Sequence, residues 1–152
     1  MPSEVGWEFR TEIEMLGREL ASVSPDLADV PWREGGWTRR QIVGHLLDSA
    51  TNNRQRFVRA AADGVYEGPG YAQDAWVDAH GYEMQPWETL LRWWQVEHEI
   101  LMEVVDRIAE DRLNAQCVVG GYEPVPLRYL IQDYVRHQRH HLYQIKFPTK
   151  AQ

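Results

Sequence analysis

Cysteine is almost absent from this sequence, since Cys117 is the only one. A single thiol cannot form a disulfide within the chain, and it cannot supply the several sulfur ligands of a cysteine-rich zinc site. If the chain binds a metal ion, we therefore expect histidine and carboxylate side chains to hold it.

Long apolar runs and an excess of basic residues are also missing. No segment approaches the ~18 consecutive apolar residues of a membrane-spanning helix. The N-terminal stretch, MPSEVGWEF, has no basic start followed by an apolar run. The 23 acidic residues outnumber the 16 basic ones, and the resulting net charge of −7 disfavours nucleic acid or an anionic membrane as a partner. We predict a cytoplasmic protein with neither partner.

The rest of the composition is typical of a folded protein. Hydrophobic residues make up 43% of the chain and aromatic residues 11%, which is more than a disordered chain contains. A length of 152 residues suits one domain with a substantial core. We predict a single domain over residues 1–152.

Four segments repeat apolar residues every three or four positions, which is the pattern of amphipathic helices. They cover approximately residues 9–23, 38–63, 86–108 and 126–147. Thr38 and Gln41 form a capping-box signal at the start of the second segment. Pro86 and Pro126 suit the first turns of the third and fourth. Four such helices predict an all-α fold, a four-helix bundle with a long connection between the second and third helices.

That connection, residues 64–86, is rich in glycine, proline and aromatic residues. We expect a short helical turn near residues 72–79 and a loop that covers one end of the bundle. The aromatic side chains either line a pocket or serve only packing. Farther on, the helical pattern weakens, and residues 117–122 are predicted to form a small extended excursion or a hairpin.

Histidines gather in the last helix. His137 and His141 stand four residues apart, so a helix turns their side chains only ~40° from each other. Both lie at the edge of the apolar stripe, whereas His140 is expected to face solvent. On the second helix, His45 also lies beside the apolar stripe. If these two helices are neighbours, three imidazoles converge inside the bundle.

A site of three imidazole nitrogens suits a divalent ion, with zinc or nickel preferred and iron or manganese as alternatives. Fewer than four protein ligands leave room for water or substrate, as in catalytic sites. The competing interpretation is chance, because histidine pairs four apart are frequent and this pair lacks the glutamate of the HExxH metalloprotease motif. Of the other histidines, His98 is interpreted as a hydrogen-bonded core residue in preference to a site residue, and His80 as an exposed loop residue.

A polar seam follows His45 along the second helix and comprises Ser49, Asn52 and Arg56. Asn52 and Arg56 are candidates for contacting a substrate or the carboxylate of a thiol, with an inter-helix hydrogen bond or a surface contact as the equal alternative. Asp133, four residues before His137, is a candidate to orient a ligand imidazole. A solvated carboxylate is the simpler interpretation of Asp133.

The second segment, GWTRRQIVGHLLDSATNNRQRFVRA, resembles the corresponding helix of DinB-like proteins, particularly the YfiT-like branch that includes bacillithiol transferases. The last segment, LIQDYVRHQRHHLYQI, resembles the closing H-x-x-x-H helix of the same family. The intervening YAQDAWV and the Trp-rich third helix are also similar, so the resemblance spans nearly the whole chain. It implies a four-helix bundle, frequently a homodimer, with three histidine ligands to a nickel or zinc ion at His45, His137 and His141.

The resemblance also implies a class of activity. Characterised family members attach low-molecular-weight thiols to electrophiles or rearrange thiol-linked substrates. The leading hypothesis is a metal-dependent thiol transferase that activates bacillithiol, mycothiol or glutathione for reaction with a small-molecule substrate. The alternatives are a metal-dependent hydrolase that activates water, and a stress-related metal-binding protein without turnover.

Overall fold

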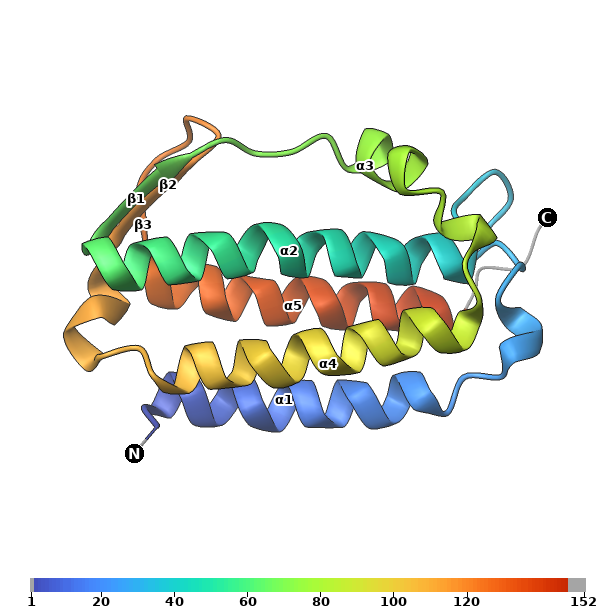
Figure 1. Cartoon of the computed structure of the whole chain (residues 1–152), viewed down its shortest axis with the longest axis horizontal. Helices are drawn as coiled ribbons and strands as arrows, with labels where there is room; N and C mark the ends of the chain where they lie inside the picture. The colour runs from blue at the N-terminus through green and yellow to red at the C-terminus, as the bar shows by residue number, and fades with distance from the viewer. Residues whose placement is uncertain (1, 148–152) are drawn as a thin grey trace.

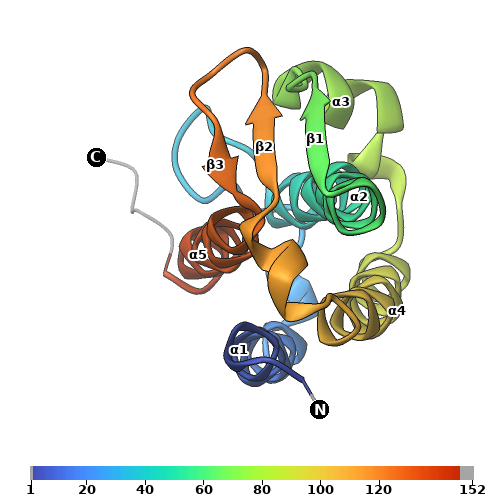
Figure 2. The same cartoon turned by 90° about the vertical axis from the view of Figure 1, so that its left-hand side faces the viewer.

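The computed structural model describes residues 2–147, and four long helices make up most of it (Figure 1). They are α1 (Glu4–Ala21), α2 (Arg39–Asp63), α4 (Trp87–Asp106) and α5 (Leu127–Lys146). In the end-on view, α1 and α2 lie diagonally opposite each other, and each contacts both α4 and α5 (Figure 2). This arrangement confirms the predicted all-α four-helix bundle.

The ends of α2 follow local sequence signals. Thr38 Oγ1 accepts a hydrogen bond from the backbone N–H of Gln41 at 3.2 Å, and Gln41 Oε1 accepts one from the backbone N–H of Thr38 at 3.0 Å. This is the predicted capping box. At the other end, Gly64 has a φ of 80°, a left-handed conformation that suits a residue without a Cβ atom.

The capping box gives a first prediction. Replacing Thr38 with Ala removes the hydroxyl that satisfies the Gln41 N–H, so we expect the free energy of unfolding to fall by about 1 kcal/mol. Urea denaturation measures this change. Thr89→Ala, at an exposed position within α4, is the matched control and should leave stability almost unchanged. Equal effects of the two substitutions would contradict a stabilising role for the cap.

The connection from α2 to α4 differs from the prediction. It contains β1 (Val65–Gly68), α3 (Gln73–His80) and the 3-10 turn η2 (Tyr82–Met84), and α3 matches the predicted helical turn. Instead of covering one end of the bundle, the connection runs back along the length of α2 (Figure 1). The physical reason is that α2 and α4 point in the same direction, so the chain must return along all of α2 before α4 begins.

A small sheet lies at the end of the bundle where α2 finishes. Its order is β1-β2-β3, with β2 (Gln116–Val119) antiparallel to β3 (Val125–Pro126), so the predicted hairpin is present. The parallel pairing of β1 with β2 was not predicted. Strands this short carry too little alternation to reveal a partner far away in the sequence. The 3-10 turns η1 (Pro25–Leu27) and η3 (Glu110–Asn114) complete the connections.

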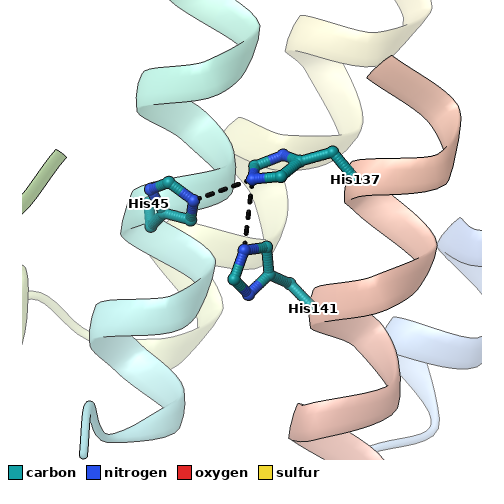
Figure 3. A group of neighbouring side chains, drawn as sticks. All are labelled: His45, His137 and His141. Atoms are coloured by element: carbon teal, nitrogen blue, oxygen red, sulfur yellow. Dashed lines mark hydrogen bonds between the residues drawn. The ribbon is translucent and has the colours of Figure 1, made fainter. Parts of the chain in front are cut away.

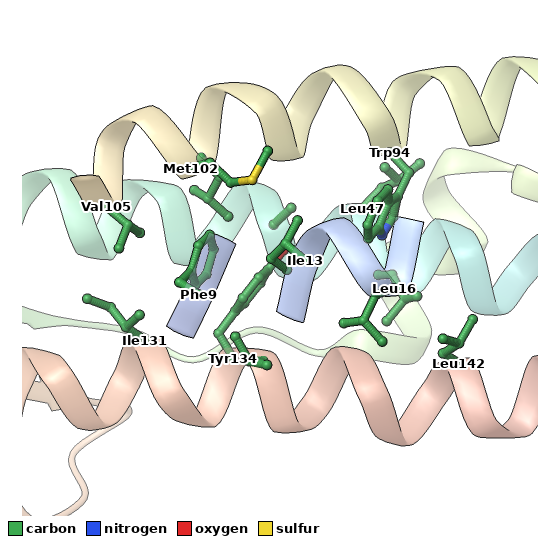
Figure 4. Close-up of a cluster of buried hydrophobic side chains, with 14 of the residues drawn as sticks. Phe9, Ile13, Leu16, Leu47, Trp94, Met102, Val105, Ile131, Tyr134 and Leu142 are labelled. Carbon is green, nitrogen blue, oxygen red and sulfur yellow. The ribbon is translucent and has the colours of Figure 1, made fainter. Parts of the chain in front are cut away.

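The apolar stripes of the four helices meet in one core (Figure 4). Its side chains come from every long helix and include Phe9, Ile13, Leu47, Trp94, Met102, Ile131 and Tyr134. No helix within residues 2–147 combines the length and the apolar character needed to cross a membrane.

His98 is a hydrogen-bonded residue of this core, which was the preferred interpretation of the sequence. Its Nδ1 lies 2.7 Å from the carbonyl oxygen of Trp94, so Nδ1 carries the proton and donates. The Tyr134 hydroxyl then donates to Nε2 across 2.6 Å. Burial lowers the pKa of His98 to about 4. Both ring nitrogens are satisfied inside the core, and His98 is not part of the histidine cluster described below.

The first half of α2 is buried on every side, from Ile42 to Ala50, because α3 and η2 cover the face that points away from the bundle. The Tyr82 ring lies against Gly44, and the Tyr82 hydroxyl donates a hydrogen bond of 2.6 Å to Asp48 Oδ1. Asp48 is itself buried, and burial raises the pKa of its carboxyl group. His45, the residue after Gly44, is also fully buried, and the centre of its ring lies 4.9 Å from that of Trp37.

Candidate metal centre

Three histidine side chains meet between α2 and α5 (Figure 3). His45 Nε2 lies 3.0 Å from His137 Nε2, and His141 Nε2 lies 3.1 Å from the same atom. Two neighbouring antiparallel helices produce this arrangement, because His137 and His141 sit one turn apart on α5 and face His45 across the helix interface. Each pair of rings is close to perpendicular, with interplanar angles of 77–79°.

The spacing of the nitrogens can be compared with that of ligands to one metal ion. With metal–nitrogen bonds of ~2.0 to 2.1 Å, two ligands are separated by about 2.9 Å at a right angle and about 3.4 Å at a tetrahedral angle. The two separations from His137 Nε2 lie within this interval, and all three candidate ligand atoms lie within 4.8 Å of one another. Hydrogen bonding alone satisfies the cluster poorly, since His137 Nε2 has either one proton or one lone pair and faces two other ring nitrogens. The donor set therefore fits a divalent ion.

The electrostatics of the three rings favour their neutral, ligating forms. Burial, together with the neighbouring His141 and His137, lowers the pKa of His45 to about 3. Burial and His137 lower the pKa of His141 to about 4, and burial also lowers that of His137. All three rings are consequently uncharged near neutral pH, with lone pairs available to a cation.

Hydrogen-bond partners orient two of the rings. His141 Nδ1 donates to Gln144 Oε1 at 2.7 Å, which leaves the His141 Nε2 lone pair facing the cluster. Ser49 Oγ lies 3.5 Å from His137 Nδ1. The sequence analysis did not single out Gln144, although its position three residues after His141 on one helix face was a usable signal. Asp133, the predicted orienting carboxylate, instead lies beside Arg136 at 3.3 Å and is largely exposed.

A groove of about 360 Å³ opens beside His137. It runs between α2 and α5 toward the small sheet, and Tyr71 from the connection forms one wall. Its lining residues are Ser49, Asn53, Arg56, Tyr71, Cys117, Val119, Tyr122, Glu123, Val125, Tyr129, Leu130, Asp133, Tyr134 and His137. One candidate ligand, His137, thus lines a groove whose volume can hold a small molecule.

The groove includes only part of the predicted polar seam. Arg56 lines the groove, whereas Asn52 does not. Asp133, the candidate from α5, also lines the groove. The amide of Asn52 donates to the carbonyl oxygen of Asp48 at 2.9 Å, and its side chain lines a separate hollow with Arg59. The next residue, Asn53, takes the groove position. A helical wheel defines the seam but cannot show on which side of it the neighbouring helix lies.

The two remaining histidines lie outside the cluster. His140 is exposed, as predicted. His80 is also exposed, but it ends α3 and is not part of a loop, and its Nδ1 lies 3.2 Å from the buried Asp48 carboxylate. Since Tyr82 binds the same carboxylate, His80 contributes to the attachment of α3 and η2 to α2.

The family model of the DinB superfamily matches residues 8–145, nearly the whole described chain. The chain belongs to the DinB superfamily.

Two relatives match most of the chain. The chain is 26% identical over 139 residues to a protein of Oceanobacillus iheyensis named "Putative metal-dependent hydrolase OB0413", covering 91% of this chain and 80% of the relative. It is 28% identical over 138 residues to a protein of the same description from Geobacillus thermodenitrificans, covering 87% of this chain and 75% of the relative.

Solved structures show the same fold. YfiT from Bacillus subtilis, described as having an unusual four-helix bundle topology, aligns with a TM-score of 0.83 at 22% identity, covering 96% of this chain and 86% of YfiT. The mycothiol-dependent maleylpyruvate isomerase aligns with a TM-score of 0.77 at 17% identity. That alignment covers 93% of this chain but 59% of the isomerase, so the isomerase contains a substantial additional part.

Proposed function

We propose that this DinB protein binds one divalent metal ion through His45, His137 and His141 and transfers a low-molecular-weight thiol to an electrophile. The observation that carries the proposal is the convergence of three imidazoles, with the Nε2 atoms of His45 and His141 3.0 and 3.1 Å from that of His137, which lines a groove. A protein with this fold is described as mycothiol-dependent, which supports a thiol as the co-substrate. Zinc and nickel suit three imidazole ligands best, ahead of iron and manganese.

A divalent ion held there would supply Lewis acidity, which lowers the pKa of a thiol or water molecule in a remaining coordination position. The protein's own residues set the geometry. Burial beneath Trp37 keeps water away from His45, and Gln144 fixes the ring of His141. The groove would hold the second reactant beside His137 and so bring the two reactants close together.

Hydrolysis is the second candidate, because two relatives that match most of this chain carry the name "Putative metal-dependent hydrolase". The same three histidines would serve, with water in place of the thiol. The groove is compatible with either reaction, since its walls combine apolar and polar side chains.

A thiol panel tests the two functions against each other. Protein without a histidine tag is loaded with zinc or nickel and given a chloronitrobenzene electrophile with bacillithiol, mycothiol or glutathione, and separately a nitrophenyl ester in plain buffer. We expect metal-dependent, thiol-dependent consumption of the electrophile. Turnover of the ester without any thiol would favour hydrolysis. Metal binding without turnover in either assay would refute both catalytic functions and leave the non-catalytic alternative.

The orienting hydrogen bond gives a separate prediction. Gln144→Leu removes the acceptor of the His141 Nδ1–H, so the ring loses its fixed orientation. We expect metal affinity to fall by roughly 10- to 100-fold, the range typical for such partners. Competition with a chromogenic chelator measures it. His140→Ala, on the same helix but exposed, is the control, and unchanged affinity in Gln144→Leu would contradict the assigned role.

A further inference from the structure

In the described part of the chain, Arg56 is the one arginine or lysine that lines the groove beside His137, and it also borders the separate hollow that Asn52 lines. It is only 9% exposed. Within residues 2–147 it forms no ion pair, although most long basic side chains this deeply placed are paired. Its hydrogen bonds to Asn53 Oδ1 and to the carbonyl oxygen of Pro69 are long, at 3.5 and 3.4 Å. A guanidinium has five N–H donors, so most of the hydrogen-bonding capacity of Arg56 is unused by the protein.

The surroundings hold this guanidinium in place without neutralising it. Asn53 donates to the backbone oxygen of Ser49 at 2.8 Å, which directs its amide oxygen toward Arg56. On the other side, the Arg56 guanidinium lies 5.9 Å from the centre of the Tyr71 ring. A positive group fixed by neutral partners and facing a groove is arranged to receive an anion.

The position of Arg56 limits the length of that anion. Ser49 lies level with His137, and Arg56 follows seven residues later on α2. At 1.5 Å per residue, the two levels are about 10 Å apart along the helix. Because helical side chains lean toward the N-terminus, the Arg56 guanidinium points back toward His137 and shortens the gap. A ligand that reaches both groups spans roughly 5 to 10 Å.

The groove also favours one kind of anion. Glu123 and Asp133 line the same space, so a doubly charged phosphate would meet repulsion that a single carboxylate largely avoids. A planar carboxylate matches the fork of a guanidinium. The remaining walls are mostly aromatic and aliphatic, and they suit an apolar or flat body between the two ends of the ligand.

We propose that Arg56 forms a carboxylate-binding subsite, and that the protein acts on small, elongated monocarboxylates whose reacting end lies at the three histidines. This inference rests on the proposed function and adds the substrate class to it.

The first test examines the subsite without metal. In NMR titrations of the metal-free protein, we expect phenylacetate to shift the side-chain Nε–H signal of Arg56 and to bind at least about tenfold more tightly than neutral phenylacetamide. Inorganic phosphate should bind more weakly than phenylacetate. Arg56→Gln should abolish the preference for the carboxylate. Arg59→Gln, an exposed arginine on the same helix that lines only the separate hollow, should keep it.

The second test includes the metal. In cobalt-loaded protein, the thiolate-to-cobalt absorption band is titrated with mercaptoalkanoic acids of increasing chain length and with mercaptoalcohols of the same lengths. We expect the acids to bind about tenfold or more tightly than the alcohols at an intermediate length, and only when Arg56 is present. The alcohols should bind wild type and Arg56→Gln equally, which shows that the variant is folded and metal-loaded.

The two tests separate two kinds of failure. If phenylacetate has no advantage over phenylacetamide, or keeps it in Arg56→Gln, the carboxylate subsite is overturned even when thiols bind cobalt. If no thiol reaches cobalt while Arg56 still selects the carboxylate, the thiol-transfer function is wrong and the subsite stands.

Discussion

Replacing His137 with Ala should abolish stoichiometric metal binding. His137 Nε2 lies 3.0 and 3.1 Å from the Nε2 atoms of His45 and His141, so its removal deletes the ligand nitrogen that is close to both others. Loss of a group that merely orients a ligand costs roughly 10- to 100-fold in metal affinity. Loss of the central ligand should therefore cost more than about 100-fold.

Two measurements check this expectation. Elemental analysis of tag-free protein should give about one metal ion per wild-type chain and none in the variant. In thermal unfolding, metal at about 100 times the dissociation constant should stabilise wild type by about 2.7 kcal/mol. For a chain of this size that raises the melting temperature by roughly 5 to 10 °C, and the variant should show no such shift.

Two further variants make the result specific. His140→Ala changes the exposed neighbour and should behave as wild type in both measurements. His137→Gln keeps most of the side-chain volume and guards against a folding defect in His137→Ala. If His137→Ala retained the metal, or if His140→Ala lost it to the same degree, the assignment of the ligands would be wrong.

Replacing Gly44 with Ala should destabilise the fold strongly. A Cβ atom at position 44 would lie 2.0 Å from Tyr82 Cδ2 and 2.2 Å from Tyr82 Cγ, far inside van der Waals contact. The Tyr82 ring is buried and cannot move without breaking its hydrogen bond to the buried Asp48. Overpacking costs about 1 to 3 kcal/mol, and a buried group that loses its partner costs a similar amount. Ala favours a helix over Gly by only about 1 kcal/mol, so its propensity offsets little of this loss in stability.

The expected net effect is a loss of roughly 2 to 4 kcal/mol in the free energy of unfolding, measured by urea denaturation. Gly70→Ala is the matched control, because an added Cβ at position 70 meets nothing within 4 Å. In a Tyr82→Ala background, Gly44→Ala should cost little, since the clashing ring is gone. A large cost in that background, or a small one in wild type, would contradict the close packing of η2 on α2.

Much of the fold was predictable because helix signals are local. The apolar spacing in residues 9–23 and 86–108 and the Thr38 capping box depend only on residues within a few turns of one another. The predicted hairpin at residues 117–122 likewise lies within one short stretch. The path of residues 64–86 was predicted incorrectly, because it depends on the relative direction of α2 and α4, which no local pattern encodes.

The candidate site was likewise predictable only where it depends on local sequence. That His137 and His141 share a face follows from the helical repeat alone, whatever else the chain does. The sequence also placed His45 beside an apolar stripe, but only the packing of α2 against α5 brings the His45 and His137 nitrogens to 3.0 Å. The rotation of α2 about its own axis decides which side of the polar seam faces the groove. For this reason Asn53, and not Asn52, lines the groove.

By itself, the sequence determined the four helices, the absence of a cysteine-based metal site, and the pairing of two histidines on one helical turn. The tertiary structure alone decided that a third imidazole faces this pair, and that Gln144 and not Asp133 contacts it. It also decided that Arg56 lies in the groove with no ion-pair partner among residues 2–147. The reason is that periodicity fixes the direction of a side chain relative to its own helix. Distances between helices arise only when the apolar faces pack together.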